Sequence, residues 1–164
     1  MSSEPKFTIL LVCTGNTCRS PLAVGILKKF LEEKGIDNIE VESAGIAAYA
    51  GSPASLFAVD TARNFGINIS QHSARQLTRE MAQDSDLILV MAPEHLDYIS
   101  KTDPDLMEKS FLLKAFPGQP QGRDNYTVKD PLGGDQQAYL SCFFELDENL
   151  RRILPSLVSL AEKK

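Results

Sequence analysis

Two near-continuous apolar runs constrain the fold of this chain more than any other feature. They cover Phe7 to Val12 and Asp86 to Met91, and nearly every residue in them is Leu, Ile, Val, Phe or Met. A strand that is apolar on both faces is typical of a parallel sheet with helices on both sides. The two runs therefore predict central strands of an α/β domain.

The remaining elements alternate with these runs. A helix is expected to open at Ser20-Pro21, because Ser is a favoured N-cap and Pro a favoured first helical residue, and to stop at Gly35. Pro155 is expected to break or kink the last helix. The expected strands are 7–12, 39–43, 86–91 and 111–113, and the expected helices are about 20–34, 53–64, 78–83, 93–100 and 136–152.

This order of elements implies parallel pairing with right-handed crossovers. We therefore predict a single domain over residues 1–164, a three-layer α/β/α fold with a four-stranded parallel sheet. Ligands of such sheets bind beyond the carboxyl ends of the strands, where the loop that starts at Cys13 is expected to lie. Residues 116–135 are rich in Pro and Gly and predict a long surface loop, which in compact domains is usually functional or disordered.

The composition excludes several classes of protein. The net charge of −5 argues against a nucleic-acid partner, which needs a concentrated basic surface. No apolar stretch approaches the ~20 residues of a membrane span, and the N-terminus does not resemble a signal peptide, so we expect no membrane partner and a cytoplasmic location. Three cysteines are too few for a disulfide framework, and no histidine lies near Cys13 and Cys18 to suggest zinc.

The segment from Cys13 to Pro21 carries the strongest chemical signal. It joins a buried strand to a helix N-terminus, whose free backbone N–H groups favour an anion. Gly15 and Asn16 tolerate positive φ, so the loop can curl its amides toward one centre, and Arg19 adds donors that match phosphate oxygens. The same positive field is expected to lower the pKa of Cys13 and make its thiolate a nucleophile.

A lone buried cysteine usually only packs against its neighbours and has no catalytic role. Here the combination of Cys13, Arg19 and Ser20-Pro21 favours catalysis.

These residues resemble the phosphate-binding loop of the low-molecular-weight protein tyrosine phosphatases. Ser43-Ala44-Gly45, the strand ending at Met91 and Asp130-Pro131 also fall where that family places them, so the resemblance covers essentially the whole chain. It implies a cysteinyl-phosphate intermediate on Cys13 and no metal or other cofactor. It also implies that Asp130 acts first as general acid and then as base. The expected partners are a phosphorylated protein or peptide substrate and inorganic phosphate as product.

The resemblance also assigns supporting roles. Asn16 and Ser43 are expected to brace the loop through side-chain hydrogen bonds, and Ser20 is expected to bond to the Cys13 sulfur, to cap the helix, or both. Asp124 and Asp135 are weaker candidates for the acid than Asp130. The expected phosphate-binding residues are Thr14, Gly15, Asn16, Thr17, Cys18 and Ser20.

The two histidines give no sign of a catalytic role. His72 lies in a segment that resembles a recurring part of the family, so we expect it to support the fold. His95 is expected to be a structural or surface residue. Tyr126 and Tyr139 are expected to pack or to line a rim.

The substrate remains open between phosphotyrosine and phosphoarginine. Tyrosine-specific relatives usually carry Ile where this chain has Thr17, and aromatic residues after Asp-Pro where it has Leu132-Gly133-Gly134. Both features resemble the protein arginine phosphatase branch and favour phosphoarginine.

Two alternatives to a protein phosphatase remain. Arsenate reduction would need further cysteines, for which Cys142 alone is a poor substitute. A non-catalytic phosphate-binding module would need neither Cys13 nor Asp130. Because Cys13 and Cys18 share one loop, we also hypothesise that they form a reversible disulfide under oxidation.

Overall fold

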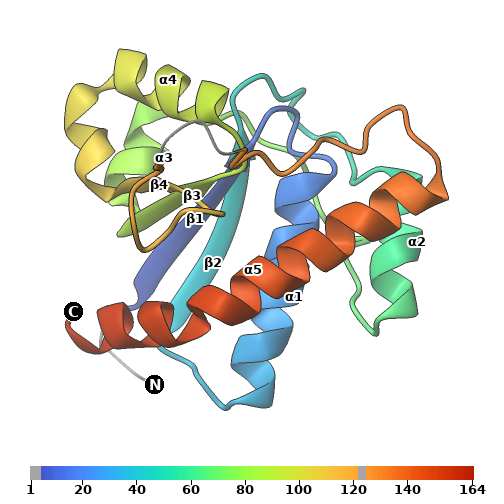
Figure 1. Ribbon diagram of the computed structural model, residues 1–164, viewed down its shortest axis with the longest axis horizontal. Coiled ribbons are helices and arrows are strands. Elements are labelled where there is room, and N and C mark those ends of the chain that lie inside the picture. The colour runs from blue at the N-terminus through green and yellow to red at the C-terminus, as the bar shows by residue number, and fades with distance from the viewer. Residues whose placement is uncertain (1–4, 122–124) are drawn as a thin grey trace.

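The computed structural model describes residues 5–121 and 125–164 (Figure 1). The strands are β1 (Phe7–Cys13), β2 (Ile39–Gly45), β3 (Leu87–Val90) and β4 (Ser110–Leu112). The helices are α1 (Arg19–Glu33), α2 (Leu56–Asn64), α3 (Arg79–Asp84), α4 (Pro93–Thr102), the 3-10 helix η1 (Pro104–Lys109) and α5 (Gln136–Glu162). The predicted order of elements is confirmed, with η1 as an unforeseen addition.

The four strands form one parallel sheet in the order β2-β1-β3-β4. The chain runs from β1 outward to β2 and then returns to the other side of β1 with β3. The direction of winding therefore reverses between β1 and β3, and a ligand crevice is expected at this switch point. Cys13 is the last residue of β1 and pairs with Gly45 of β2.

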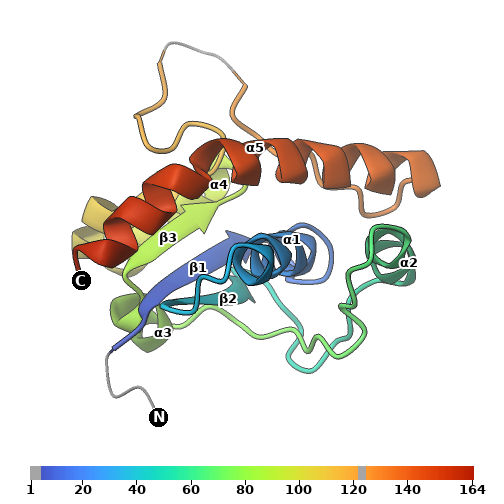
Figure 2. The same cartoon turned by 90° about the horizontal axis from the view of Figure 1, so that it is seen from below.

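Helices cover both faces of the sheet, as the three-layer prediction requires. Figure 1 shows α3 and α4 on one side and α1 and α5 on the other. Figure 2 shows α2 beside the N-terminal half of α5, away from the strands. Side chains alternate between the two layers along each strand. Ile9 and Leu11 of β1 enter the core beneath α1 and α5, whereas Leu10 and Val12 enter the core beneath α3 and α4.

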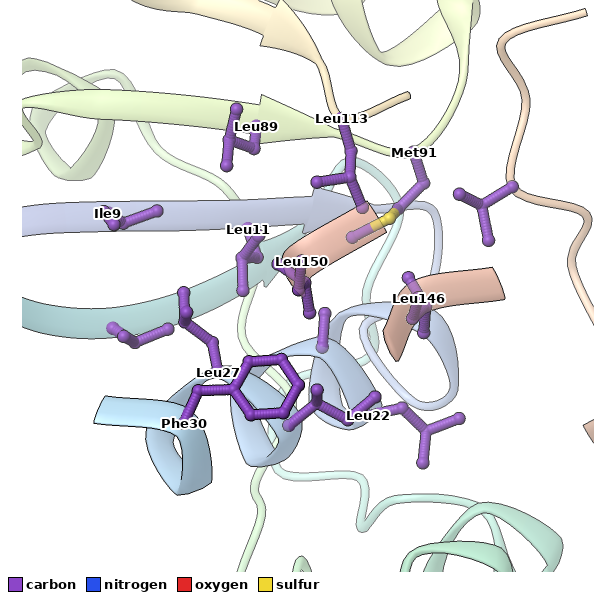
Figure 3. Close-up of a cluster of buried hydrophobic side chains, with 14 of the residues drawn as sticks. Ile9, Leu11, Leu22, Leu27, Phe30, Leu89, Met91, Leu113, Leu146 and Leu150 are labelled. Atoms are coloured by element: carbon purple, nitrogen blue, oxygen red, sulfur yellow. The ribbon is translucent and has the colours of Figure 1, made fainter. Parts of the chain in front are cut away.

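The larger core lies between the sheet and the pair α1 and α5. Its side chains converge from β1, β3 and both helices, as Figure 3 shows for Leu11, Leu27, Met91 and Leu146. All four side chains are fully buried. This packing fixes the first turn of α1 against the end of β1, which is where the loop of interest begins.

The last helix differs from its prediction. Instead of ending near Arg152, α5 continues through Pro155 to Glu162. A proline in a helix interior costs about 3 kcal/mol because it removes a hydrogen bond and crowds the preceding turn. Leu154 and Leu157 are buried on either side of it, and each fully buried leucine contributes about 1.5–3 kcal/mol. Burial of the apolar face therefore outweighs the backbone defect.

Two other helix starts were also misplaced. The helix α2 begins at Leu56 rather than near Pro53, because the Ser55 side chain accepts a hydrogen bond from the Ala58 amide and forms the N-cap. The helix α1 begins at Arg19, after Cys18, whose side chain makes no capping hydrogen bond. Among the described helices, none is long and apolar enough to cross a membrane.

Candidate active site

The loop after β1 lies at the switch point of the sheet. Figure 1 shows it near the loop that follows β2 and the segment that leads into α5. Asn16 has a positive φ of 59°, which lets the chain reverse toward α1. Gly15, the other residue expected to permit such a turn, has a negative or extended φ. Gly45 has no room for a side chain, because a Cβ there would lie 2.5 Å from the carbonyl oxygen of Thr14.

Asn16 is the centre of a buried hydrogen-bond network. Its Nδ2 donates to the Oγ atoms of Ser20 at 2.7 Å and Ser43 at 2.9 Å. Its Oδ1 accepts from the backbone N–H of Arg75 at 3.0 Å, and its carbonyl oxygen lies 2.6 Å from Nε2 of His72. Asn16 is 0% exposed, so every polar atom of its side chain is satisfied within the protein. The network braces the turn at Asn16, as expected for Asn16 and Ser43.

Cys13 points into this loop from the end of β1. Its Sγ lies 2.8 Å from Oγ of Ser20 and accepts a hydrogen bond from the Asn16 amide at 3.3 Å. Burial raises the pKa of the Cys13 thiol, while Ser20, the charge of Arg19 and the Asn16 amide lower it. Burial has the largest effect, so the lowered pKa expected from the sequence is wrong for this structure. The loop does supply the donors, but it also excludes water from the sulfur.

Ser20 therefore has one of the two roles considered for it. Its side chain bonds to the Cys13 sulfur and to Asn16, inside the first turn of α1. It does not cap the helix, because the N-cap position belongs to Cys18. The expectation that Ser20 caps the helix was therefore wrong. The loop enters the helix two residues earlier than expected, with Cys18 at the N-cap position.

The Arg19 side chain lies across the loop and is only 3% exposed. Its Nη1 donates to the carbonyl oxygen of Val128 at 2.9 Å, and its Nη2 donates to Oγ1 of Thr14 at 3.1 Å. The same Nη2 lies 3.6 Å from Oδ2 of Asp130. The guanidinium thus joins the loop to the segment that precedes α5.

Asp130 is a candidate acid whose side chain lies beside the loop after β1. Its Oδ1 accepts a hydrogen bond from the Leu132 amide at 3.0 Å, and its side chain is 40% exposed. Asp135, a weaker candidate, instead caps α5 by accepting from the Ala138 amide at 3.0 Å. Asp124, the other candidate, lies outside the described residues. Of the two described candidates, only Asp130 lies beside Arg19.

A cleft of about 190 Å³ connects these groups. One wall comes from the loop after β1, and the other comes from Asp130 and Leu132. Its lining consists of Cys13, Thr14, Gly15, Thr17, Cys18, Arg19, Ala47, Asp130 and Leu132. A thiol, a guanidinium and a carboxyl group therefore meet in one small opening, although the net charge of the whole chain is −5. Among residues 5–121 and 125–164, no cluster of three or more His, Cys, Asp or Glu side chains could hold a metal.

Cys18 belongs to the lining of the cleft but is only 3% exposed. Its thiol donates to Oγ of Ser55 at 3.5 Å and lies 3.4 Å from the hydroxyl of Tyr139. Ser55 in turn donates to the same hydroxyl at 3.2 Å. Burial and the contact with Cys18 raise the pKa of Tyr139 to about 12, against a smaller lowering by the hydrogen bond from Ser55. Tyr139 is thus a packed, neutral residue, as the sequence analysis expected, and it connects α5 to the loop.

The sequence analysis missed the contacts of His95. This residue is 0% exposed in α4, and its Nε2 lies 2.9 Å from Oγ1 of Thr14. The only sequence signal is its position just after β3, at the same edge of the sheet as Cys13. The partners are far apart in the chain, so no local pattern could have paired them.

The third cysteine does not suit a disulfide relay. Cys142 is 3% exposed within α5, and burial raises the pKa of its thiol to about 12. A thiol held neutral in this way is a poor attacking group in disulfide exchange. Arsenate reduction, which needs further reactive cysteines, is therefore not favoured.

Comparison with known proteins agrees with this geometry. The family model described as low molecular weight phosphotyrosine protein phosphatase matches residues 8–164. The chain is 36% identical to a protein-arginine-phosphatase of Geobacillus stearothermophilus, over 92% of this chain and 96% of the relative. It is 38% identical to the low molecular weight protein-tyrosine-phosphatase Etp of Escherichia coli K12, over 84% and 86%.

Solved structures give the same result. The YwlE arginine phosphatase of Geobacillus stearothermophilus superposes with a TM-score of 0.83 at 34% identity and covers 96% of both chains. The tyrosine phosphatase Wzb of Escherichia coli K30, in complex with sulphate, gives 0.80 at 28% identity over 92% of this chain and 97% of Wzb. The chain therefore belongs to the low molecular weight phosphotyrosine protein phosphatase family and is a cysteine-dependent protein phosphatase.

Proposed function

We propose that Cys13, Arg19 and Asp130 perform phosphoryl transfer in this protein. The observation that carries the proposal is their meeting in one cleft, with the Cys13 sulfur 2.8 Å from Ser20 and the Arg19 guanidinium 3.6 Å from Asp130. A related solved structure, a YwlE arginine phosphatase mutant with serine in place of a cysteine, contains a phosphorylated active-site serine. That finding supports the loop cysteine as the group that accepts phosphate.

In the first step, Cys13 attacks the phosphorus atom and the bond to the leaving group breaks. The reactive form is the thiolate, and burial opposes it. The Ser20 hydroxyl and the Asn16 amide stabilise the negative sulfur, and Arg19 holds the phosphoryl oxygens. Asp130 gives its proton to the departing atom, which leaves a cysteinyl phosphate on Cys13.

In the second step, water attacks the cysteinyl phosphate. Asp130, now ionised, accepts a proton from that water, and the bond between sulfur and phosphorus breaks. Inorganic phosphate leaves, and Cys13 returns to its starting state. Each proton that Asp130 gives in the first step is regained in the second, so the cycle consumes only water.

We further propose that phosphoarginine on proteins is the preferred substrate. Thr17 is half-buried in the lining of the cleft, and its carbonyl oxygen accepts a hydrogen bond from the Ser55 amide at 3.0 Å. The backbone of Thr17 is therefore fixed, and its hydroxyl offers a polar contact close to the phosphorus. On the facing wall, Leu132 is 64% exposed and provides no aromatic ring to stack on a tyrosine.

The decisive experiment compares phosphoarginine and phosphotyrosine peptides of the same sequence. The wild-type protein should hydrolyse the phosphoarginine peptide with the higher kcat/KM. A clear preference for phosphotyrosine would overturn the substrate assignment without affecting the phosphatase assignment. Absence of turnover on both peptides and on a generic aryl phosphate would contradict the catalytic roles themselves.

Replacing Thr17 with isoleucine should shift this preference. We expect Thr17→Ile to raise kcat/KM for phosphotyrosine relative to phosphoarginine by at least about tenfold, which requires only ~1.4 kcal/mol of differential transition-state binding. The reason is that isoleucine removes the hydroxyl and adds apolar surface. Thr17→Ser, which keeps the hydroxyl, is the matched control and should retain the wild-type ratio. A ratio that Thr17→Ile leaves unchanged would rule out a specificity role for this residue.

Oxidation should link Cys13 to Cys18. Hydrogen peroxide converts the Cys13 thiolate to a sulfenic acid and is itself reduced to water. The Cys18 thiol can then attack the sulfenic sulfur and release a second water to form a disulfide. Both cysteines are free in the structure, and Cys18 must leave its contacts with Ser55 and Tyr139 to react.

Peptide mapping by mass spectrometry checks this expectation. Peroxide should inactivate the enzyme and yield a Cys13–Cys18 disulfide. Dithiothreitol should then reduce this disulfide and restore activity. The Cys18→Ser variant should instead accumulate sulfinic acid at Cys13. Sulfinic acid at Cys13 beside a free Cys18 in the wild-type protein would disprove the protective role.

A further inference from the structure

His95 is a buried titratable group that the proposed mechanism leaves unused. It is 0% exposed and occupies the first turn of α4. Its Nε2 lies 2.9 Å from Oγ1 of Thr14, one of the residues that line the cleft. Its Nδ1 is buried and has no hydrogen-bond partner among the described residues. One ring nitrogen therefore has a single possible partner and the other has none.

The protonation state of His95 follows from its surroundings. Burial and the nearby charge of Arg19 lower its pKa to about 4, so the ring is neutral near pH 7 and carries one N–H. A buried N–H without an acceptor is rarer in proteins than an acceptor without a donor. Because Nδ1 lacks a partner among the described residues and Nε2 faces Thr14, the hydrogen belongs on Nε2, and His95 donates to Thr14.

This assignment determines the direction of the Thr14 hydroxyl. A hydroxyl has two lone pairs and one hydrogen. Arg19 Nη2 can only donate, and it occupies one lone pair of Oγ1 at 3.1 Å. His95 Nε2 occupies the other. The hydroxyl hydrogen must then point to a third group, and Thr14 lines the cleft next to Cys13.

We propose that His95 is a positioning residue that directs the Thr14 hydroxyl into the cleft as a hydrogen-bond donor to an oxygen of the substrate's phosphoryl group. The inference rests on the phosphoryl-transfer function proposed above and adds a donor to it. A donor held in place before the reaction costs no reorganisation when charge develops on the phosphoryl oxygens. Removing one such donor from an enzyme typically lowers kcat by about 10²–10³-fold.

The position of the hydrogen on His95 can be measured without any substrate. A long-range ¹H–¹⁵N correlation spectrum at pH 7 distinguishes a protonated ring nitrogen from an unprotonated one. The chain has two histidines, so the spectrum of His95→Gln assigns the signals of His95. We expect a protonated Nε2 and an unprotonated Nδ1. The opposite tautomer would mean that Thr14 donates to His95, and it would overturn the proposal.

Kinetics of matched variants test the consequence. Thr14→Val keeps the shape of the side chain without its hydroxyl, and it should lower kcat by about 10²-fold with little change in KM. His95→Leu should lower kcat in the same direction by at least about tenfold. His95→Gln, whose amide can donate to Thr14, and Thr14→Ser, which keeps the hydroxyl, should each recover most of the activity. The double variant Thr14→Val/His95→Leu should be no slower than Thr14→Val alone.

Tyr98→Phe is the control for a general effect on α4. It removes a hydrogen bond from Gln76 to the Tyr98 hydroxyl on the same helix and should leave kcat unchanged. Independent, multiplicative losses in the double variant, or no recovery with His95→Gln, would show that His95 only packs. If His95→Leu does not fold, the spectrum of the wild-type protein and the kinetics of His95→Gln still test the positioning role of His95.

The two proposals fail in different ways. A wild-type protein that hydrolyses neither peptide nor aryl phosphate would overturn the proposed function and this role with it. An active wild-type enzyme in which Nδ1 of His95 carries the hydrogen would overturn only the role of His95.

Discussion

Replacing Cys13 with serine should abolish turnover. The sulfur is the atom proposed to form the bond to phosphorus, and the serine hydroxyl is a far weaker nucleophile at neutral pH. Loss of an enzyme's nucleophile lowers kcat by a factor on the order of 10⁶. Steady-state hydrolysis of an aryl phosphate, with a detection limit several orders of magnitude below the wild-type rate, measures this loss.

Binding should survive the same substitution. Arg19 and the loop amides do not depend on the sulfur, and the smaller Oγ can still accept from Ser20 and Asn16. Phosphate or vanadate should therefore still bind to Cys13→Ser in a titration. Cys142→Ala serves as the control, because Cys142 is also a buried cysteine but lies in α5. A Cys13→Ser protein that retains a substantial fraction of the wild-type rate would exclude a cysteinyl-phosphate intermediate.

The sequence predicted the architecture well where local patterns report on it directly. The apolar runs that became β1 and β3 are buried on both faces, and periodicity identifies such strands without knowledge of their neighbours. The helix after Cys13 was also recognisable, although Ser20 proved to bond to the sulfur rather than to cap α1. Both kinds of serine contact involve the same residue type, so the sequence could not distinguish them.

Features that depend on contacts distant in sequence were not predictable in this way. The hydrogen bond between Thr14 and His95 joins the loop after β1 to the first turn of α4, and only the strand order β2-β1-β3-β4 brings these two segments together. The course of α5 past Pro155 depends on the core beneath it, since the local rule alone predicts a break. The raised pKa of Cys13 is a further case, because the sequence reveals the nearby donors but not how completely the thiol is buried.

Asp130→Asn should slow the enzyme by a smaller but still large factor. A positioned general acid or base contributes roughly 10²–10⁴-fold, and an amide can give or accept no proton in its place. Asparagine keeps the size of the side chain and its Oδ1 can still accept from the Leu132 amide, so the loop should remain in place. We therefore expect kcat to fall by roughly 10²–10⁴-fold with a much smaller change in KM.

The size of this loss should depend on the leaving group, which is the sharper test of an acid role. The guanidine released from phosphoarginine is strongly basic and must leave protonated, whereas a nitrophenolate leaves readily as an anion. The loss in Asp130→Asn should therefore be greatest for phosphoarginine peptides and smallest for p-nitrophenyl phosphate when cleavage is followed in a single turnover. Asp135→Asn is the matched control, because Asp135 belongs to the same segment and asparagine preserves its N-cap of α5. Equal losses for good and poor leaving groups would leave Asp130 a role in holding Arg19 rather than in moving protons.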